Sequence, residues 1–107
     1  MKSLRLGPVM FALALWAPPG FADQELARTN GCFQCHKPGN AGVGPSFAEI
    51  AAKYRGNEAA RASLIVAVKA GSKGNWTALS KGVPMPPFSP RISDGDIERL
   101  VDWIKGL

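Results

Sequence analysis

The sequence predicts a small all-α domain, built from four to five short helices that follow a removable N-terminal leader. Two observations predict the helices: serines stand three positions before acidic residues at two segment starts, and apolar residues near the C-terminus recur at helical spacing. A third observation is that residues 23–107 show no strand-like alternation of apolar and polar residues. With 107 residues the chain holds at most one such domain.

The leader is predicted over residues 1–22. Lys2 and Arg5 give it a positively charged start, residues 6–16 are uncharged and mostly apolar, and Ala22 is a small residue directly before the first acidic one. This order is typical of a secretory signal peptide, and the apolar stretch is too short for a membrane span. We expect cleavage near Ala22, export to the periplasm and no membrane span afterwards. An uncleaved membrane anchor is the alternative.

The mature domain is predicted to be residues 23–107. The whole chain has a formal charge of +5, and removal of the two basic residues of the leader reduces it to +3. The remaining basic residues are scattered rather than clustered, so nucleic-acid binding is not expected. A domain of this size has a thin core and usually gains stability from a disulfide, a metal or a cofactor.

The first helix is predicted from Gln24 to Asn30, and it leads into a Cys-x-x-Cys-His motif formed by Cys32, Cys35 and His36. Residues at i and i+3 share one face of a helical turn, so both thiols can add to the two vinyl groups on one edge of a haem. The imidazole that follows can then bind the iron as the proximal ligand. The motif therefore predicts one covalently attached haem c.

Three other uses of these residues are open. A structural zinc site needs about four protein ligands, whereas the chain has one histidine and two cysteines. A thioredoxin-like redox pair would need a βαβ context. A disulfide between Cys32 and Cys35 would leave the adjacent histidine without a role. The export signal favours the haem interpretation, because exported thiols meet an oxidising environment and need a covalent partner.

A loop and two further helices are predicted next. Residues 37–45 contain three glycines and two prolines and are expected to form the loop. Ser46 with Glu49 makes a capping box for a second helix that ends near Tyr54. Asn57 is the expected cap of a third helix, whose apolar stripe is Leu64, Ile65 and Val68.

Gly71 is the expected C-terminal cap of the third helix, and residues 71–92 form a long irregular loop that carries Met85. Loops of this length in compact domains are usually functional. Met85 is the only methionine of residues 23–107, and the neighbouring prolines stiffen its backbone. We expect its thioether to be the distal iron ligand, which favours a carrier over a catalyst because both axial positions are filled. The alternative is a methionine that only fills the core.

The last helix is predicted to follow Ser93, which gives a second capping signal with Asp96. Its apolar residues follow the spacing i, i+3, i+4 and i+7 with a tryptophan beside them, and they are Ile97, Leu100, Val101, Ile104 and Trp103. This stripe predicts the side of the helix that faces the core.

Five segments, taken in order, resemble the small bacterial class I cytochromes c of the short periplasmic type. They are residues 32–36, 44–47, 71–76, 84–87 and 100–104. The resemblance extends over essentially all of the mature domain. It implies a cytochrome c-like fold, in which helices wrap a covalently attached haem and the first and last helices cross near the attachment turn.

The resemblance also implies two further cofactor contacts. The backbone carbonyl of Pro45 would accept a hydrogen bond from His36, and the indole nitrogen of Trp76 would donate one to a haem propionate. Core packing is the alternative for Trp76. The sequence departs from the family at Ala67, where relatives often have a basic residue that reaches a propionate, and at Phe88, where some have an asparagine that bonds the methionine sulfur. The more apolar pocket is expected to raise the reduction potential.

The expected function is one-electron transfer by a diffusible monomer between periplasmic redox proteins, without enzymatic activity. The loops that flank the expected haem site carry basic residues that could steer an acidic partner, namely Lys37, Lys73, Lys81 and Arg91. An ordinary solvated surface is the alternative for them. Two other functions are open: a dedicated electron-accepting subunit of a periplasmic dehydrogenase or reductase complex, and a ligand-binding or sensing haem protein.

Overall fold

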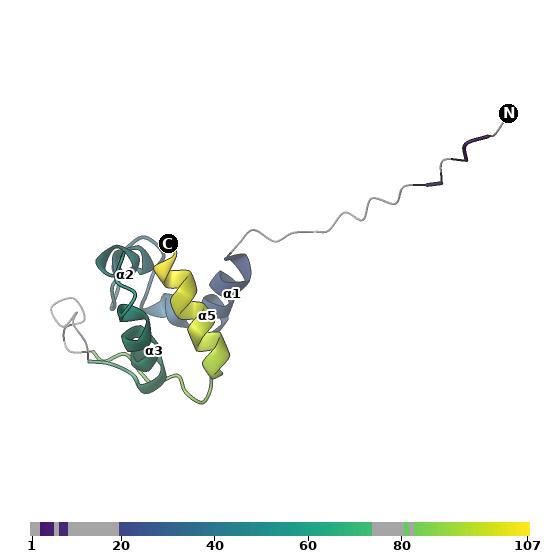
Figure 1. Cartoon of the computed structure of the whole chain (residues 1–107). Coiled ribbons are helices and arrows are strands. Elements are labelled where there is room, and N and C mark those ends of the chain that lie inside the picture. The colour runs from purple at the N-terminus through teal and green to yellow at the C-terminus, as the bar shows by residue number, and fades with distance from the viewer. Residues whose placement is uncertain (1–2, 6, 9–19, 74–80, 82) are drawn as a thin grey trace.

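The computed structural model of the chain describes residues 3–5, 7–8, 20–73, 81 and 83–107 (Figure 1). Helices dominate this part of the chain: α1 (Phe21–Thr29), the short 3₁₀ turn η1 (Cys32–Gln34), α2 (Phe47–Lys53), α3 (Ala60–Ala70) and α5 (Asp94–Lys105). Within the same ranges, the only β-type pairing is an isolated antiparallel bridge between Ser72 and Met85. The predicted all-α fold of four to five short helices is therefore confirmed.

Helix α5 organises the domain, because it packs against α1, α2 and α3 (Figure 1). The hydroxyl of Ser93 caps its start and accepts a hydrogen bond from the Asp96 amide at 3.2 Å. The buried face of α5 is the predicted one, Ile97, Leu100 and Val101. Each aliphatic side chain buried in this way contributes about 1.5–3 kcal/mol relative to exposure.

The core lies where α1 and α5 meet the segment that precedes α5. Its central cluster consists of Ala27, Phe88, Ile92, Ile97 and Leu100. Partly buried residues of η1, α3 and the loop before α5 pack against this cluster, including both Cys32 and Met85. The core and the expected cofactor site are therefore continuous.

Two helix starts differ from the predicted ones. Helix α1 begins at Phe21 rather than Gln24, because the carbonyl of Gly20 accepts a hydrogen bond from the Gln24 amide at 2.9 Å and adds a turn without a side-chain cap. Regular helix in α3 begins at Ala60. Asn57 caps the turn before it, and its side-chain oxygen accepts a hydrogen bond from the Ala60 amide at 3.2 Å.

Exposed ion pairs connect α5 to its neighbours. They are Arg61–Asp102 at 2.7 Å, Arg99–Asp23 at 2.8 Å and Lys69–Asp94 at 3.3 Å. Pairs of this kind contribute little to stability individually. They link α1 and α3 to α5 at the surface.

The segment predicted as a leader is described only at residues 3–5, 7–8 and 20–22, and its cleavage stays a prediction. Helix α1 begins within its last residues, at Phe21. Among the residues that the structure describes, no helix is long and apolar enough to cross a membrane.

Candidate haem-binding site

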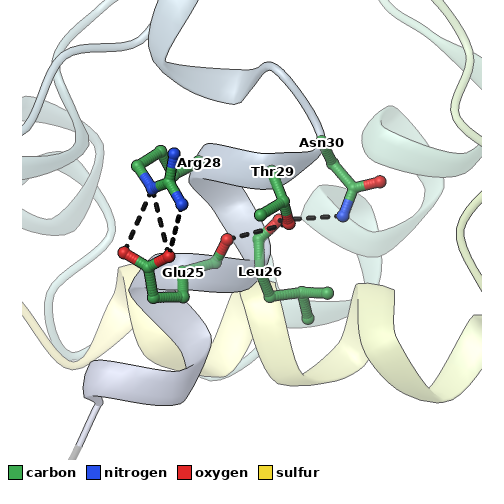
Figure 2. Close-up of polar contacts among 5 residues, drawn as sticks. All are labelled: Glu25, Leu26, Arg28, Thr29 and Asn30. Carbon is green, nitrogen blue, oxygen red and sulfur yellow. Dashed lines mark hydrogen bonds and ion pairs between the residues drawn. The ribbon is translucent and has the colours of Figure 1, made fainter.

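The last turn of α1 is held by its own side chains immediately before the Cys-x-x-Cys-His motif (Figure 2). The hydroxyl of Thr29 donates to the carbonyl of Glu25 at 2.9 Å, and the side-chain amide of Asn30 donates to the carbonyl of Leu26 at 2.8 Å. Gly31 then takes a φ of 79°, in the left-handed region that favours glycine. The chain can therefore leave α1 and enter the turn of the motif at once.

The two thiols of the motif are half-buried and are not joined in a disulfide. Hydrogen bonds from the amides of Cys35 and His36 to the carbonyl of Cys32, at 3.3 and 2.8 Å, hold the motif in a tight turn. Burial raises the pKa of the Cys32 thiol. Among the described residues, no cluster of three or more histidine, cysteine and acidic side chains is arranged to hold a metal ion.

The imidazole of His36 is oriented by three neighbours. Its Nδ1 lies 2.8 Å from the carbonyl oxygen of Pro45, and because a carbonyl can only accept, Nδ1 must carry the proton. The lone pair is therefore on Nε2, the nitrogen that can bind a metal. The ring stacks on Phe47 with centroids 5.5 Å apart. A Cβ atom at Gly44 would lie 2.7 Å from the imidazole Cε1, so only glycine fits beside the ring.

Helix α2 supplies the residues on this side of the imidazole. Ser46 is fully buried, and its hydroxyl accepts a hydrogen bond from the Glu49 amide at 3.0 Å, as the capping box predicted. Phe47 is also bound to the residue that follows the motif, because its amide donates to the carbonyl of Lys37 at 2.9 Å. The start of α2 thus holds Pro45 and Phe47 against His36.

Met85 is fastened to the end of α3 by backbone hydrogen bonds. Ser72 and Met85 exchange two of them, at 3.0 and 2.7 Å. Farther along, the amide of Phe88 donates to the carbonyl of Val68 at 3.1 Å. Gly71 has a φ of 81° and ψ of 169°, and a Cβ atom there would lie 2.7 Å from the carbonyl oxygen of Met85. The methionine is therefore positioned by α3 as well as by its own prolines.

Cys32, Cys35, His36 and Met85 all line one cavity of about 760 Å³. The size is typical of pockets for small molecules and cofactors. Two thiols for covalent attachment, an imidazole with its Nε2 lone pair available and a thioether form a donor set that fits a haem. The arrangement defines a small helical haem-binding domain.

Of the other residues that the sequence analysis placed at the haem site, three line this cavity and one lies outside the residues that the structure describes. Pro45, Ala67 and Phe88 line the cavity. Trp76 lies outside the described residues. Sequence reasoning assigned no role in the site to Phe47 or to Tyr54, which also lines the cavity. The position of Phe47, directly after Gly44, Pro45 and Ser46, was the sequence feature that could have indicated its contact with His36.

Comparison with known proteins identifies the family. A family model described as "Cytochrome c" matches residues 24–107. Cytochrome c-551 of Allochromatium vinosum is 46% identical over 91 residues, which cover 85% of this chain and 92% of that protein. Cytochrome c-552 of Nitrosomonas europaea is 38% identical over 107 residues, covering 100% of this chain and 99% of that protein.

Solved structures agree with the sequence comparisons. The crystal structure of wild-type Nitrosomonas europaea cytochrome c552 superimposes with a TM-score of 0.69 at 39% identity, covering 78% of this chain and 98% of that one. The class 1 cytochrome MtoD of Sideroxydans lithotrophicus gives a TM-score of 0.68 at 34% identity, with 84% and 97% covered. The chain belongs to the cytochrome c family, as a small class I member. It carries one covalently bound haem c and transfers electrons.

Proposed function

We propose that the haem is attached through Cys32 and Cys35, with His36 and Met85 as its two axial ligands. The observation that carries this assignment is the hydrogen bond from His36 Nδ1 to Pro45, which leaves Nε2 to bind iron in the cavity that Met85 also lines. Met85 and His36 are the only methionine and the only histidine of residues 23–107. A haem held by these residues would supply one-electron chemistry and would leave no coordination site open for a substrate.

The remaining residues of the proposed site orient the two iron ligands and the haem. Pro45 fixes the imidazole through its carbonyl, as hydrogen-bond partners of metal-ligating histidines commonly do. Ser72 and Gly71 hold the backbone of Met85 at the end of α3. Trp76 would donate its indole N–H to a haem propionate.

The protein would act as an electron carrier rather than an enzyme, as a monomer in the periplasm after removal of residues 1–22. The residues that line the cavity are consistent with docking to an acidic redox protein. Exposed Val43 and Val83 line the cavity together with two basic side chains, Lys73 and Arg91. Exposed apolar and positively charged side chains on one cavity suit a brief encounter that charge steers.

Spectra of the exported protein in both redox states test the ligand assignment. A sharp reduced α-band, with the weak far-red absorbance of oxidised methionine-ligated haem, is the expected result. Met85→Ala should abolish the far-red absorbance and allow carbon monoxide to bind the reduced protein at neutral pH, which the unaltered protein should not do. Carbon monoxide binding by the unaltered protein would favour a sensing function, and absence of covalent haem on a denaturing gel would contradict the attachment site.

Oxidation by small inorganic reagents tests the docking surface without a known partner. The rate with anionic ferricyanide should fall as salt is added, and the rate with a cationic cobalt complex should rise. Lys73→Gln should weaken both dependences. Equal salt responses for the two oxidants would contradict a positive surface at the cavity mouth.

A further inference from the structure

The cavity wall contains a rigid aromatic platform at Phe88. The side chain is 8% exposed and belongs to the central core cluster. Its amide donates to the carbonyl of Val68 at 3.1 Å, and its carbonyl accepts from the amide of Ile92 at 2.8 Å. Hydrogen bonds therefore fix the backbone of Phe88 at its amide and its carbonyl, and core packing holds the ring that lines the cavity.

Arg91 lies over this platform. Its guanidinium carbon is 4.8 Å from the centroid of the Phe88 ring, within the range of a cation–π contact. A planar guanidinium can stack on an aromatic ring, and the contact restricts the arginine side chain. A lysine ammonium is not planar and makes this contact less well. Arg91 also lines the cavity, although the residue as a whole is exposed. Its charge is thus held at one place on the cavity wall.

No acidic side chain among the described residues compensates this charge. Among the described residues that line the cavity, none is acidic. The basic ones, apart from His36, are Lys73 and Arg91, and the other titratable ones are the two cysteines and Tyr54. No described carboxylate makes an ion pair with Arg91.

We propose that Arg91, held against the ring of Phe88, is a fixed positive charge on the haem cavity that raises the reduction potential. The inference deepens the proposed function and rests on it. A positive charge destabilises the ferric state more than the ferrous state, because the ferric state carries one more positive charge. Ala67 supplies no charge from α3, so the contribution comes from the loop after Met85 instead.

Redox titration of the holoprotein tests the proposal with three variants. Arg91→Gln should lower the equilibrium constant for reduction about threefold, which is about 28 mV because a tenfold change corresponds to 59 mV for one electron. Arg91→Lys should fall between this variant and the unaltered protein. Arg99→Gln is the matched control, since it removes the same charge from a side chain that pairs with Asp23 instead of lining the cavity, and it should leave the potential unchanged.

Salt and spectroscopy separate a local charge effect from a structural one. The difference between Arg91→Gln and the unaltered protein should shrink as ionic strength rises, because Arg91 is exposed. The far-red absorbance should be the same in both. An unchanged or raised potential in Arg91→Gln, with that absorbance intact, would overturn the proposal. Loss of covalent haem or of the methionine absorbance in the unaltered protein would instead count against the proposed function.

Discussion

The backbones of Ser72 and Met85 exchange two hydrogen bonds, at 3.0 and 2.7 Å, and so join the second residue after α3 to the proposed distal ligand. Gly71 makes this join possible. Its backbone conformation is one that only glycine adopts readily, and its Cα faces the carbonyl oxygen of Met85 so closely that a Cβ atom would lie 2.7 Å away. The position of the thioether is therefore coupled to the end of α3.

Gly71→Ala should displace Met85 and destabilise the protein. The backbone strain alone costs about 1–3 kcal/mol, and the contact with the Met85 carbonyl adds to it. We expect a lower midpoint in urea unfolding together with loss of the far-red methionine absorbance in part of the oxidised population. Gly56→Ala is the matched control.

Gly56 also has a positive φ, 75°, but no atom lies within 4 Å of a Cβ placed there. Alanine at this position should therefore be strained without touching the site. Gly56→Ala is expected to lower stability and leave the methionine absorbance unchanged. If Gly71→Ala also kept the methionine absorbance, the hydrogen bonds between Ser72 and Met85 would not be what positions the ligand.

Gly44→Ala should disturb the proximal side. The added methyl group would lie 2.7 Å from Cε1 and 2.9 Å from Nδ1 of His36, so the imidazole must move. Overpacking of this kind costs about 1–3 kcal/mol. Proton NMR of the holoprotein should show shifted His36 ring resonances, and urea unfolding should show the loss of stability. Gly39→Ala, where no atom is within 4 Å, should change neither, and an unshifted His36 in Gly44→Ala would contradict the close packing.

Local sequence signals predicted the helices well because the interactions that begin them are local. The cap residues Ser46 and Ser93 each accept a hydrogen bond from an amide three positions later, which is the contact that the pattern predicts. The start of α1 was missed because the contact that adds its first turn joins backbone atoms of Gly20 and Gln24. No side-chain pattern marks such a contact.

The sequence predicted the residues that attach the haem and bind its iron, but not most of the residues that hold them in place. The motif of residues 32–36 and the single methionine of the mature domain pointed to the cavity residues from sequence. The stack of Phe47 on His36 and that of Arg91 on Phe88 depend on how loops fold back, which has no periodic signature. Even the hydrogen bond between His36 and Pro45 was expected only through the family resemblance.

The ion pair between Arg61 and Asp102 should stabilise the protein in a pH-dependent way. The hydrogen bonds from Arg61 hold the pKa of Asp102 below its ordinary value. A carboxyl with a lowered pKa in the folded state adds stability above its unfolded pKa, about 4, and loses it as the pH falls through the folded value. The contribution should be small, because both side chains are about half exposed.

A double-mutant cycle with Arg61→Gln and Asp102→Asn isolates this pair. The single variants alone would not, because Asp102 is in the last turn of α5, where removing a negative charge also relieves repulsion from the helix dipole. The coupling measured by urea unfolding should favour the native pair at neutral pH and diminish below about pH 4. A coupling that is the same at both pH values would contradict the assignment of the lowered pKa to Arg61.

Phe88→Asn should lower the reduction potential. Phe88 is an apolar part of the cavity wall, and a polar amide there would favour the more highly charged ferric state. Because the substitution also removes the ring under Arg91, it should be made in the Arg91→Gln background as well. A further fall of the potential in that background isolates the effect of polarity. Redox titration that shows an unchanged or raised potential for Phe88→Asn would rule out the apolar wall as a determinant of the potential.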